Sequence, residues 1–365
     1  MPARYRADHV GSLLRPPELL QARADREAGR LRSDELREVE NRAIQDVLEL
    51  QRHVGLDVLT DGEFRRGSWL TNMAEAVDGF VAERILIEWY GPGGGTEAST
   101  SQVVGGRLQQ KRRLTEHEVA FLKTRSPGPF KVTVPSPSSL LLVGYKPGLT
   151  DRVYATRAEM VQELARIVRR EMAALVEEGV PYIQLDAPYY TSYLDPRVRE
   201  HLRQNSVDPD QAFEDSLAAD RAALAGVQRE GVTLAMHLCR GNSRSRWFTV
   251  GGYDPIAEKL FGSLPVDRFL LEYDTERAGG FAPLRFVPRG KTVVLGLITT
   301  KEPQLESPDA LRRRIDEASR YVPVEDLAIS PQCGFASVAA GNLVSLDDQR
   351  RKLELVVEIA RSVWG

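Results

Sequence analysis

The feature that most constrains this chain is a structural unit that recurs along its 365 residues. A stretch with helical periodicity ends near a glycine, a short apolar run follows, and the run closes on polar or acidic residues. In the segment 160–176 the apolar residues fall on one helical face, and "EEGVPYIQLDAP" then supplies the glycine and an apolar run that ends at Asp186. Apolar runs that alternate with amphipathic helices predict buried parallel strands.

Eight such runs can be counted, and most of them precede an amphipathic helix. The predicted strands are 6–12, 57–62, 130–135, 181–186, 232–238, 268–273, 292–299 and 326–332. The clearest predicted helices are 34–51, 212–228, 308–320 and 346–363. Eight strand–helix units over this length favour a (β/α)₈ TIM barrel over an open doubly wound sheet. Since no G-x-G-x-x-G follows the first strand, a dinucleotide-binding fold is disfavoured. We predict a single α/β barrel domain over residues 1–365.

One stretch interrupts this rhythm between the second and third predicted strands. Residues 74–129 contain two extended arms around a tip rich in Gly, Ser and Thr, which predicts a long β-hairpin with a mobile tip at 91–102. The insertion leaves the carboxyl end of strand two, on the face where barrel enzymes hold their active sites. Its place is compatible with a lid, with a contact in a homodimer, or with a surface excursion that has no role in the site.

The composition excludes several classes of partner. The net charge of −3 gives no basic field for nucleic acid. No run of about 18 apolar residues predicts a membrane span, and the polar start "MPARYRADHVGSLLRPP" lacks the apolar core of a signal peptide. Two cysteines, Cys239 and Cys333, are too few for a disulfide framework and are typical of the reducing cytoplasm. We therefore expect a cytoplasmic protein with no nucleic-acid or membrane partner.

The carboxyl ends of the predicted strands carry residues with metal-binding chemistry, and in a barrel these ends meet on one face. His237 and Cys239 are two apart on an extended segment, so their side chains point to the same side. Glu272 ends the next strand, and Cys333 ends the eighth. Imidazole, two thiolates and a carboxylate suit Zn²⁺. The structural alternatives are that each cysteine is a small buried hydrophobic residue and that Glu272 caps a helix or forms an ion pair.

Zinc bound by these four residues would leave the site at a charge of about −1. Such a site polarises a carbonyl or a water poorly, but it deprotonates a substrate thiol that binds to it. With four protein ligands, an incoming thiol must expand the coordination or displace one ligand, and Glu272 or a solvent ligand is the one expected to yield. The chemistry predicts alkyl transfer to sulfur and not hydrolysis.

Several segments together resemble the catalytic domain of cobalamin-independent methionine synthase, in particular its short, single-domain bacterial relatives. The resemblance covers nearly the whole chain, from "HVGSLLRP", "DGEFRRGSW" and "YIQLDAP" to "MHLCRGN", "FLLEYDTERAG", "LGLITTK" and "SPQCGFAS". The last four segments together are specific to the family. The resemblance implies a (β/α)₈ barrel and a zinc ion held by His237, Cys239, Glu272 and Cys333.

The resemblance also implies a substrate and its binding residues. Gly11, Ser12, Glu63 and Asp186 would hold the amino-acid part of homocysteine or a similar thiol, since two carboxylates can pair with its ammonium group. The implied reaction transfers a methyl group to the zinc-bound thiolate from a second small molecule, which could be a folate, a corrinoid or another donor.

Three departures from the synthases leave this methyl donor open. The synthases carry an additional N-terminal barrel that helps to bind polyglutamylated folate, and this chain shows none. Their histidine proton donor after strand seven has no counterpart in "LGLITTKEP". Arg65 and Arg66 follow Glu63 closely, and they either offer a guanidinium to an acid group or form a solvated surface pair.

Other functions remain as alternatives. Epoxyalkane:coenzyme M transferases are similar to this family and use zinc to activate a thiol that opens an epoxide. Their acceptor carries a sulfonate and no amine, so an arginine would matter there and Asp186 would not. The presence of both Glu63 and Asp186 favours an amino-acid thiol. A zinc-free barrel resembling uroporphyrinogen decarboxylase is disfavoured by the two cysteines, and a zinc-binding accessory protein without catalysis is a further alternative.

Overall fold

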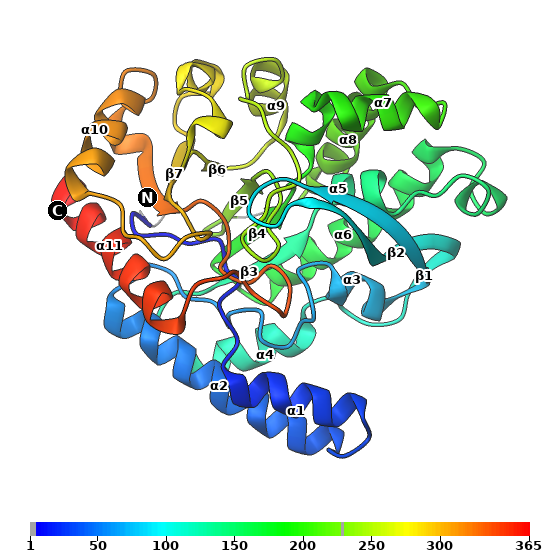
Figure 1. Ribbon diagram of the computed structural model, residues 1–365, viewed down its shortest axis with the longest axis horizontal. Coiled ribbons are helices and arrows are strands. Elements are labelled where there is room, and N and C mark those ends of the chain that lie inside the picture. Colours follow the sequence, from blue (N-terminus) through cyan, green and yellow to red (C-terminus); the bar gives the residue numbers. More distant parts are fainter. Residues whose placement is uncertain (1–4, 228–229) are drawn as a thin grey trace.

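The computed structural model describes residues 5–227 and 230–365, and its centre is a parallel six-stranded sheet in the order β3-β4-β5-β6-β7-β8. The strands are β3 (Lys131–Pro135), β4 (Tyr182–Asp186), β5 (Thr233–Leu238), β6 (Arg268–Glu272), β7 (Thr292–Ile298) and β8 (Leu327–Pro331). Helices surround these strands on the outside (Figure 1). The predicted α/β class with a parallel sheet is confirmed.

The first two predicted strands join this sheet only through single bridges. Ala7 pairs in parallel with Ile329 of β8, and Leu59 pairs with Phe130, the residue before β3. The amide of Asp57 donates to the carbonyl of Ala7 with an N···O distance of 3.1 Å. Hydrogen bonds therefore lead from β8 through both segments to β3, although neither segment forms a regular strand.

Hydrophobic side chains pack on both faces of the sheet. The larger cluster fills the space between the strands and the surrounding helices. A separate, smaller cluster consists of Tyr5, Val10, Val58, Tyr182, Ala235, Leu270, Val294 and Ala328. Its members come from the two bridging segments and from β4 to β8, so their side chains share one interior space, as in a sheet that curves around a small core.

The predicted helices are present with small shifts at their ends. They correspond to α2 (Ser33–Val54), α6 (Arg157–Glu177), α8 (Pro209–Leu224), α10 (Pro308–Ala318) and α11 (Leu346–Trp364). The predicted end of one helix, residue 228, lies outside the described residues. The other helices are α1 (Pro17–Glu27), α3 (Thr71–Ala76), α4 (Glu116–Arg125), α5 (Pro137–Val143), α7 (Pro196–Gln204) and α9 (Ala257–Ser263). Short 3₁₀ turns at 150–152, 190–194, 276–278, 282–286 and 324–326 complete the connections.

The insertion contains the predicted hairpin, formed by β1 (Val77–Trp89) and β2 (Gly95–Gln110). The predicted tip at 91–102 was wrong in extent, because residues 95–102 pair with 82–89 and only 90–94 form the turn. Tyr90 and Trp247 exchange backbone hydrogen bonds with N···O distances of 2.8 and 3.2 Å, so the tip is bonded to the connection after β5. The hairpin therefore crosses over the ends of the central strands (Figure 1).

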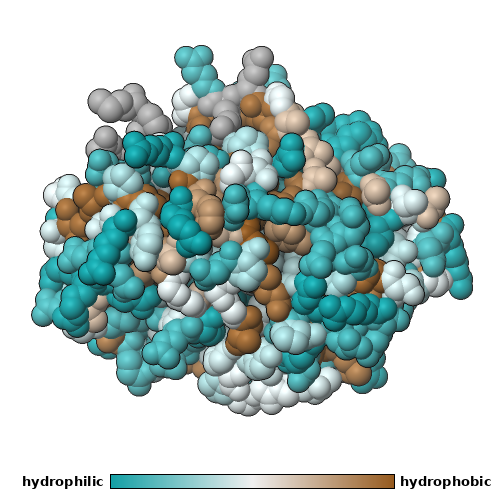
Figure 2. All heavy atoms as spheres, turned by 90° about the horizontal axis from the view of Figure 1, so that it is seen from above, coloured by the Kyte–Doolittle hydropathy of each residue, from teal (hydrophilic) through white to brown (hydrophobic). Residues whose placement is uncertain are grey.

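The face of the molecule shown in Figure 2 is mostly polar. Figure 2 shows one face dominated by hydrophilic residues, with hydrophobic residues in small, separate patches. Among residues 5–227 and 230–365, none of the helices has the length and apolar character that crossing a membrane requires.

Candidate metal and substrate site

A cavity of about 860 Å³ lies between the hairpin and the carboxyl ends of the strands. The residues that line it from the sheet side include Ser12, Glu63, Asp186, His237, Cys239 and Cys333. From the hairpin it is lined by residues 85–89 and by Glu97, Ser99, Thr100, Ser101 and Val103. This volume is typical of small-molecule sites. Six of the eight residues predicted for metal and substrate thus face one cavity.

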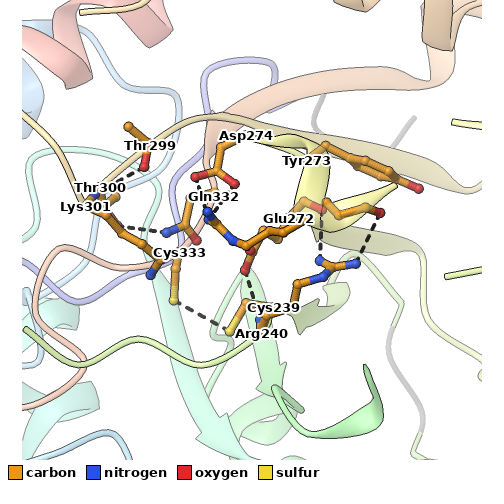
Figure 3. Close-up of polar contacts among 12 residues, drawn as sticks. Cys239, Arg240, Glu272, Tyr273, Asp274, Thr299, Thr300, Lys301, Gln332 and Cys333 are labelled. Atoms are coloured by element: carbon orange, nitrogen blue, oxygen red, sulfur yellow. Dashed lines mark hydrogen bonds and ion pairs between the residues drawn. The ribbon is translucent and has the colours of Figure 1, made fainter. Parts of the chain in front are cut away.

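Three of the four predicted metal ligands come together in its wall. The ligand atoms of His237, Cys239 and Cys333 all lie within 4.8 Å of one another, and the residues are buried. His237 belongs to β5 and Cys239 follows that strand directly, while Cys333 follows β8. The two sulfur atoms are 3.8 Å apart (Figure 3). Sulfurs about 2.3 Å from a common tetrahedral ion would be separated by about 3.8 Å, so the pair fits a shared metal ion.

The imidazole of His237 also fits a metal ligand. Both of its ring nitrogens are buried and lack a hydrogen-bond partner among the described residues, which is rare for buried polar atoms. Burial opposes the charged form of this ring, but the neighbouring Cys333 raises the pKa of His237 above its ordinary value. The hydrogen bond between the sulfurs raises the pKa of Cys239 and lowers that of Cys333. A cation bound here would satisfy all three groups at once.

The fourth predicted ligand, Glu272, is not part of that close group. Its Oε1 accepts from Arg277 Nε at 2.8 Å, and its Oε2 accepts from the backbone N–H of Arg240 at 2.9 Å. Burial opposes ionisation, but the guanidinium groups of Arg240 and Arg277 hold the pKa of Glu272 below its usual range. Figure 3 shows its carboxylate bonded to the backbone of Arg240, the residue that follows Cys239. Its role as a ligand stays a prediction.

Two close approaches of the backbone keep the cysteines in place. After Cys239 the chain turns at Gly241, whose φ is +86° and where a Cβ would lie 2.7 Å from the Cβ of Phe248. After Cys333, a Cβ on Gly334 would lie only 1.9 Å from Ser12 Oγ. Side chains are therefore excluded at both glycines, and the second one brings Ser12 against the cysteine segment.

The predicted substrate residues Glu63 and Ser12 line the cavity, whereas Gly11 is buried and is not among the lining residues. Glu63 has a left-handed backbone with a φ of +59°, which is uncommon for a residue with a side chain and is often found at binding sites. Its Oε1 accepts from Thr133 Oγ1 at 2.8 Å, while its Oε2 is buried without a partner among the described residues. A Cβ on Gly11 would meet Thr133 Cγ2 at 3.0 Å, so the chain needs glycine where it passes this carboxylate.

Asp186, the second predicted carboxylate, is the last residue of β4 and is buried in the cavity wall. Burial raises its pKa to about 7, and Glu63 contributes in the same direction while His237 opposes it. Its Oδ1 accepts from Gln184 Nε2 at 2.8 Å. Two carboxylates near one end of a cavity can bind a cation, and each becomes easier to ionise when one is present.

Arg65 and Arg66 do not form a solvated surface pair, because both side chains are largely buried. Arg66 forms a two-point ion pair with Glu118 and donates to Thr133 Oγ1 at 2.9 Å. Arg65 donates to Glu40 at 3.0 Å. The solvated-pair interpretation was wrong: these guanidinium groups neutralise internal carboxylates, since buried charges need partners.

The connection after β7 contributes a polar brace that the sequence analysis did not predict. Lys301 Nζ donates to Asn242 Oδ1 at 2.7 Å, and Asn342 Nδ2 donates to the same oxygen at 2.9 Å and to the carbonyl of Thr300 at 3.0 Å. These bonds join the connection after β7 to the connections after β5 and β8, which carry Cys239 and Cys333. The pairing joins residues far apart in sequence, so no spacing pattern announces it.

Fold and site together define a parallel α/β protein with a candidate imidazole–thiolate metal centre in the wall of a cavity. The model of the cobalamin-independent synthase catalytic domain matches residues 7–362. The chain is 37% identical over 376 residues to the uncharacterized protein YxjH of Bacillus subtilis (strain 168), covering 99% of this chain and 95% of that protein. It is 25% identical over 345 residues to a methionine synthase of Saccharolobus solfataricus, covering 92% and 91%. A solved structure of a putative vitamin-B12 independent methionine synthase from Listeria monocytogenes has 32% identity and a TM-score of 0.76, covering 100% and 99%.

The chain therefore belongs to the family of cobalamin-independent methionine synthase catalytic domains. This membership confirms the resemblance and supports a methyltransferase activity. The family uses a metal, and its reaction implies a thiol substrate, homocysteine, and a methyl donor.

Proposed function

We propose that this protein is a zinc-dependent thiol S-methyltransferase that transfers a methyl group to homocysteine, or a similar amino-acid thiol, bound as a zinc thiolate. The observation that carries the proposal is that the buried group of His237, Cys239 and Cys333 lines the same cavity as Glu63 and Asp186. We also infer that the sheet closes into the predicted (β/α)₈ TIM barrel. Two bridges support this closure, Ala7 with Ile329 and Leu59 with Phe130.

In this mechanism zinc, when bound, supplies the charge that keeps the substrate sulfur deprotonated at neutral pH. The residues of the chain bind and orient the rest of the thiol. Glu63 and Asp186 accept hydrogen bonds from its ammonium group, and Ser12 borders the same part of the cavity. The hairpin covers the cavity and limits the access of water to the sulfur. Glu272 is the proposed fourth ligand, and its bond to Arg277 would compete with that role.

The coenzyme M alternative has less support from the charges in this cavity. A sulfonate would have to lie near Glu63 and Asp186, two carboxylates that repel it. Arg66, whose guanidinium lies 3.7 Å from the carboxylate of Glu63, already pairs with Glu118. An ammonium group therefore fits this end of the cavity better than a sulfonate does.

Metal analysis and thiol titration test the proposal. We expect about one zinc ion per purified chain, since one His/Cys/Cys group is found in the described residues. In the cobalt-substituted protein, homocysteine should change the thiolate-to-metal absorption band. A protein that takes up no zinc when produced with zinc present would contradict the proposal. A response to coenzyme M without one to homocysteine would favour the epoxyalkane transferase alternative.

The methyl donor is best identified by a screen with homocysteine as the acceptor. Methyltetrahydrofolates, methylcobalamin and S-methylmethionine should be compared, with methionine formation as the readout. Transfer from one of them, lost in a Cys333→Ser variant, is the expected result. Equal methionine formation in that variant would show that the cysteine pair is not needed for the reaction.

A further inference from the structure

A line of buried polar side chains runs from Asp186 into the interior of the sheet. Because side chains alternate along a strand, Tyr182, Gln184 and Asp186 of β4 point to the same side. Gln184 has no exposed surface and lies directly below Asp186. Its Nε2 donates to Asp186 Oδ1 at 2.8 Å and to the carbonyl of Val10 at 2.7 Å. One amide thus contacts the carboxylate and the residue that precedes Gly11.

The orientation of this amide is determined by Lys131 of β3. Lys131 Nζ lies 2.8 Å from Gln184 Oε1, and an ammonium group can only donate hydrogen bonds. The atom of Gln184 that faces Lys131 must therefore be the oxygen. The amide nitrogen then has to face Val10 and Asp186, and its two hydrogens match these two acceptors.

The ammonium group of Lys131 is itself fixed by three hydrogen bonds. Its three N–H groups go to Gln184 Oε1, to Asp8 Oδ1 at 2.8 Å and to the carbonyl of His9. The other oxygen of Asp8 accepts from the hydroxyl of Tyr182 at 2.9 Å. Both side chains of the Lys131–Asp8 ion pair are fully buried. The chain of contacts therefore starts from a fixed, neutralised pair and ends at the cavity.

We propose that Gln184, oriented by Lys131, is a positioning residue for the thiol substrate, an inference that rests on the proposed function. By occupying Oδ1 of Asp186, Gln184 leaves Oδ2 to receive the substrate ammonium. By bonding to Val10 it also holds the neighbouring segment of Gly11 and Ser12 at a fixed distance from that carboxylate. The binding of the amino-acid part of the substrate thus depends on a residue that does not touch it.

Two substitutions of Gln184 test this inference in the cobalt-substituted protein. Gln184→Met removes all three hydrogen bonds, whereas Gln184→Glu keeps an acceptor for Lys131 but donates to neither Asp186 nor Val10. We expect both variants to bind zinc as the wild type does and to bind homocysteine roughly tenfold more weakly, which corresponds to about 1.4 kcal/mol. Propanethiol, which has no ammonium group, should bind to the variants and the wild type equally.

A matched control separates positioning from general loosening of the fold. Thr115→Val removes a buried hydroxyl that donates to Glu171 and does not line the cavity. It should lower stability without changing homocysteine binding. Unchanged homocysteine binding in both folded Gln184 variants would overturn the positioning role, as would an equal loss for propanethiol. If the wild-type cobalt protein responds to no thiol at all, it is the proposed function that fails, so the two failures are distinct.

Discussion

The cavity wall and the Lys131–Asp8 ion pair beneath it are both buried and polar, but only the ion pair has a partner for each of its charged atoms. Below the cavity, the Lys131–Asp8 ion pair has a partner for every donor of the ammonium group. In the cavity wall, both nitrogens of His237 and one oxygen of Glu63 have no partner among the described residues. The difference indicates which group serves folding and which awaits a ligand, because unpaired buried polar atoms are costly unless something binds to them.

The largest expected effect is on the cavity wall, where buried polar atoms lack partners among the described residues. We predict that His237→Ala lowers zinc affinity at least about 100-fold, since the ion loses one of its few protein ligands. Competition with a chromophoric chelator measures this, followed by metal analysis. His201→Ala is the matched control, because His201 also lines the cavity but is not part of the His/Cys/Cys group. Equal zinc loss in both variants would show that the assignment of the ligands is wrong.

The next largest effect concerns the Lys131–Asp8 ion pair beneath the cavity. Lys131→Met leaves the fully buried carboxylate of Asp8 without its ammonium partner, and we predict a loss of about 3–5 kcal/mol in the free energy of unfolding. Urea denaturation of the zinc-free protein measures it. Lys123→Met, which removes an ammonium from the protein surface, should cost less than about 1 kcal/mol. Similar costs at the two lysines would contradict the division into a structural and a ligand-binding group.

Glu272 is a predicted zinc ligand that also forms an ion pair with Arg277. Asp274 pairs with the same arginine, so substitutions of the two carboxylates can separate zinc binding from ion pairing. Arg277 contacts both Glu272 and Asp274, but only Glu272 is a predicted ligand. We predict that Glu272→Gln lowers zinc affinity about 10- to 100-fold, while Asp274→Asn changes it little. The chelator competition applies again. If zinc affinity falls equally in the two variants, Glu272 acts through its ion pair with Arg277 and is not a zinc ligand.

The sequence predicted the strand ends well because the pattern there is local. Apolar runs that end in His, Cys, Asp or Glu place those residues at one edge of a parallel sheet whatever the details of the connections. His237, Cys239 and Asp186 were predicted on this basis and line one cavity. The same pattern could not indicate that Glu272 would pair with Arg277, because that contact depends on how the connection after β6 folds back.

Contacts between neighbouring strands were less predictable. The bond from Lys131 to Gln184 requires both the adjacency of β3 and β4 and their register. "YIQLDAP" places Gln184 two residues before Asp186, which is a usable signal for a shared face, but nothing local identifies the lysine. The hairpin tip was predicted too long because the composition of residues 95–102 is typical of loops, whereas pairing with β1 makes them a strand.

The smallest expected effect is at Thr133, which lies between the cavity wall and the sheet interior beneath it. Its hydroxyl donates to Glu63 Oε1 at 2.8 Å and accepts from Arg66 Nη1 at 2.9 Å. Thr133→Val keeps the shape and removes both bonds, so we predict a loss of about 1 kcal/mol in the free energy of unfolding. Homocysteine binding should weaken only a few-fold, because Arg66, 3.7 Å from Glu63, still helps to hold this carboxylate in place.

Thr150→Val provides the comparison for this last effect, because Thr150 also donates one bond and accepts one in a buried position, to Val104 and from Lys146. It should destabilise the protein by a similar amount and leave homocysteine binding unchanged. Calorimetry on the zinc-loaded protein measures the binding, and urea denaturation measures the stability. If Thr133→Val lowers only the stability, Arg66 holds Glu63 in place without the hydroxyl. Thr133 then serves folding, and only the carboxylate of Glu63 serves substrate binding.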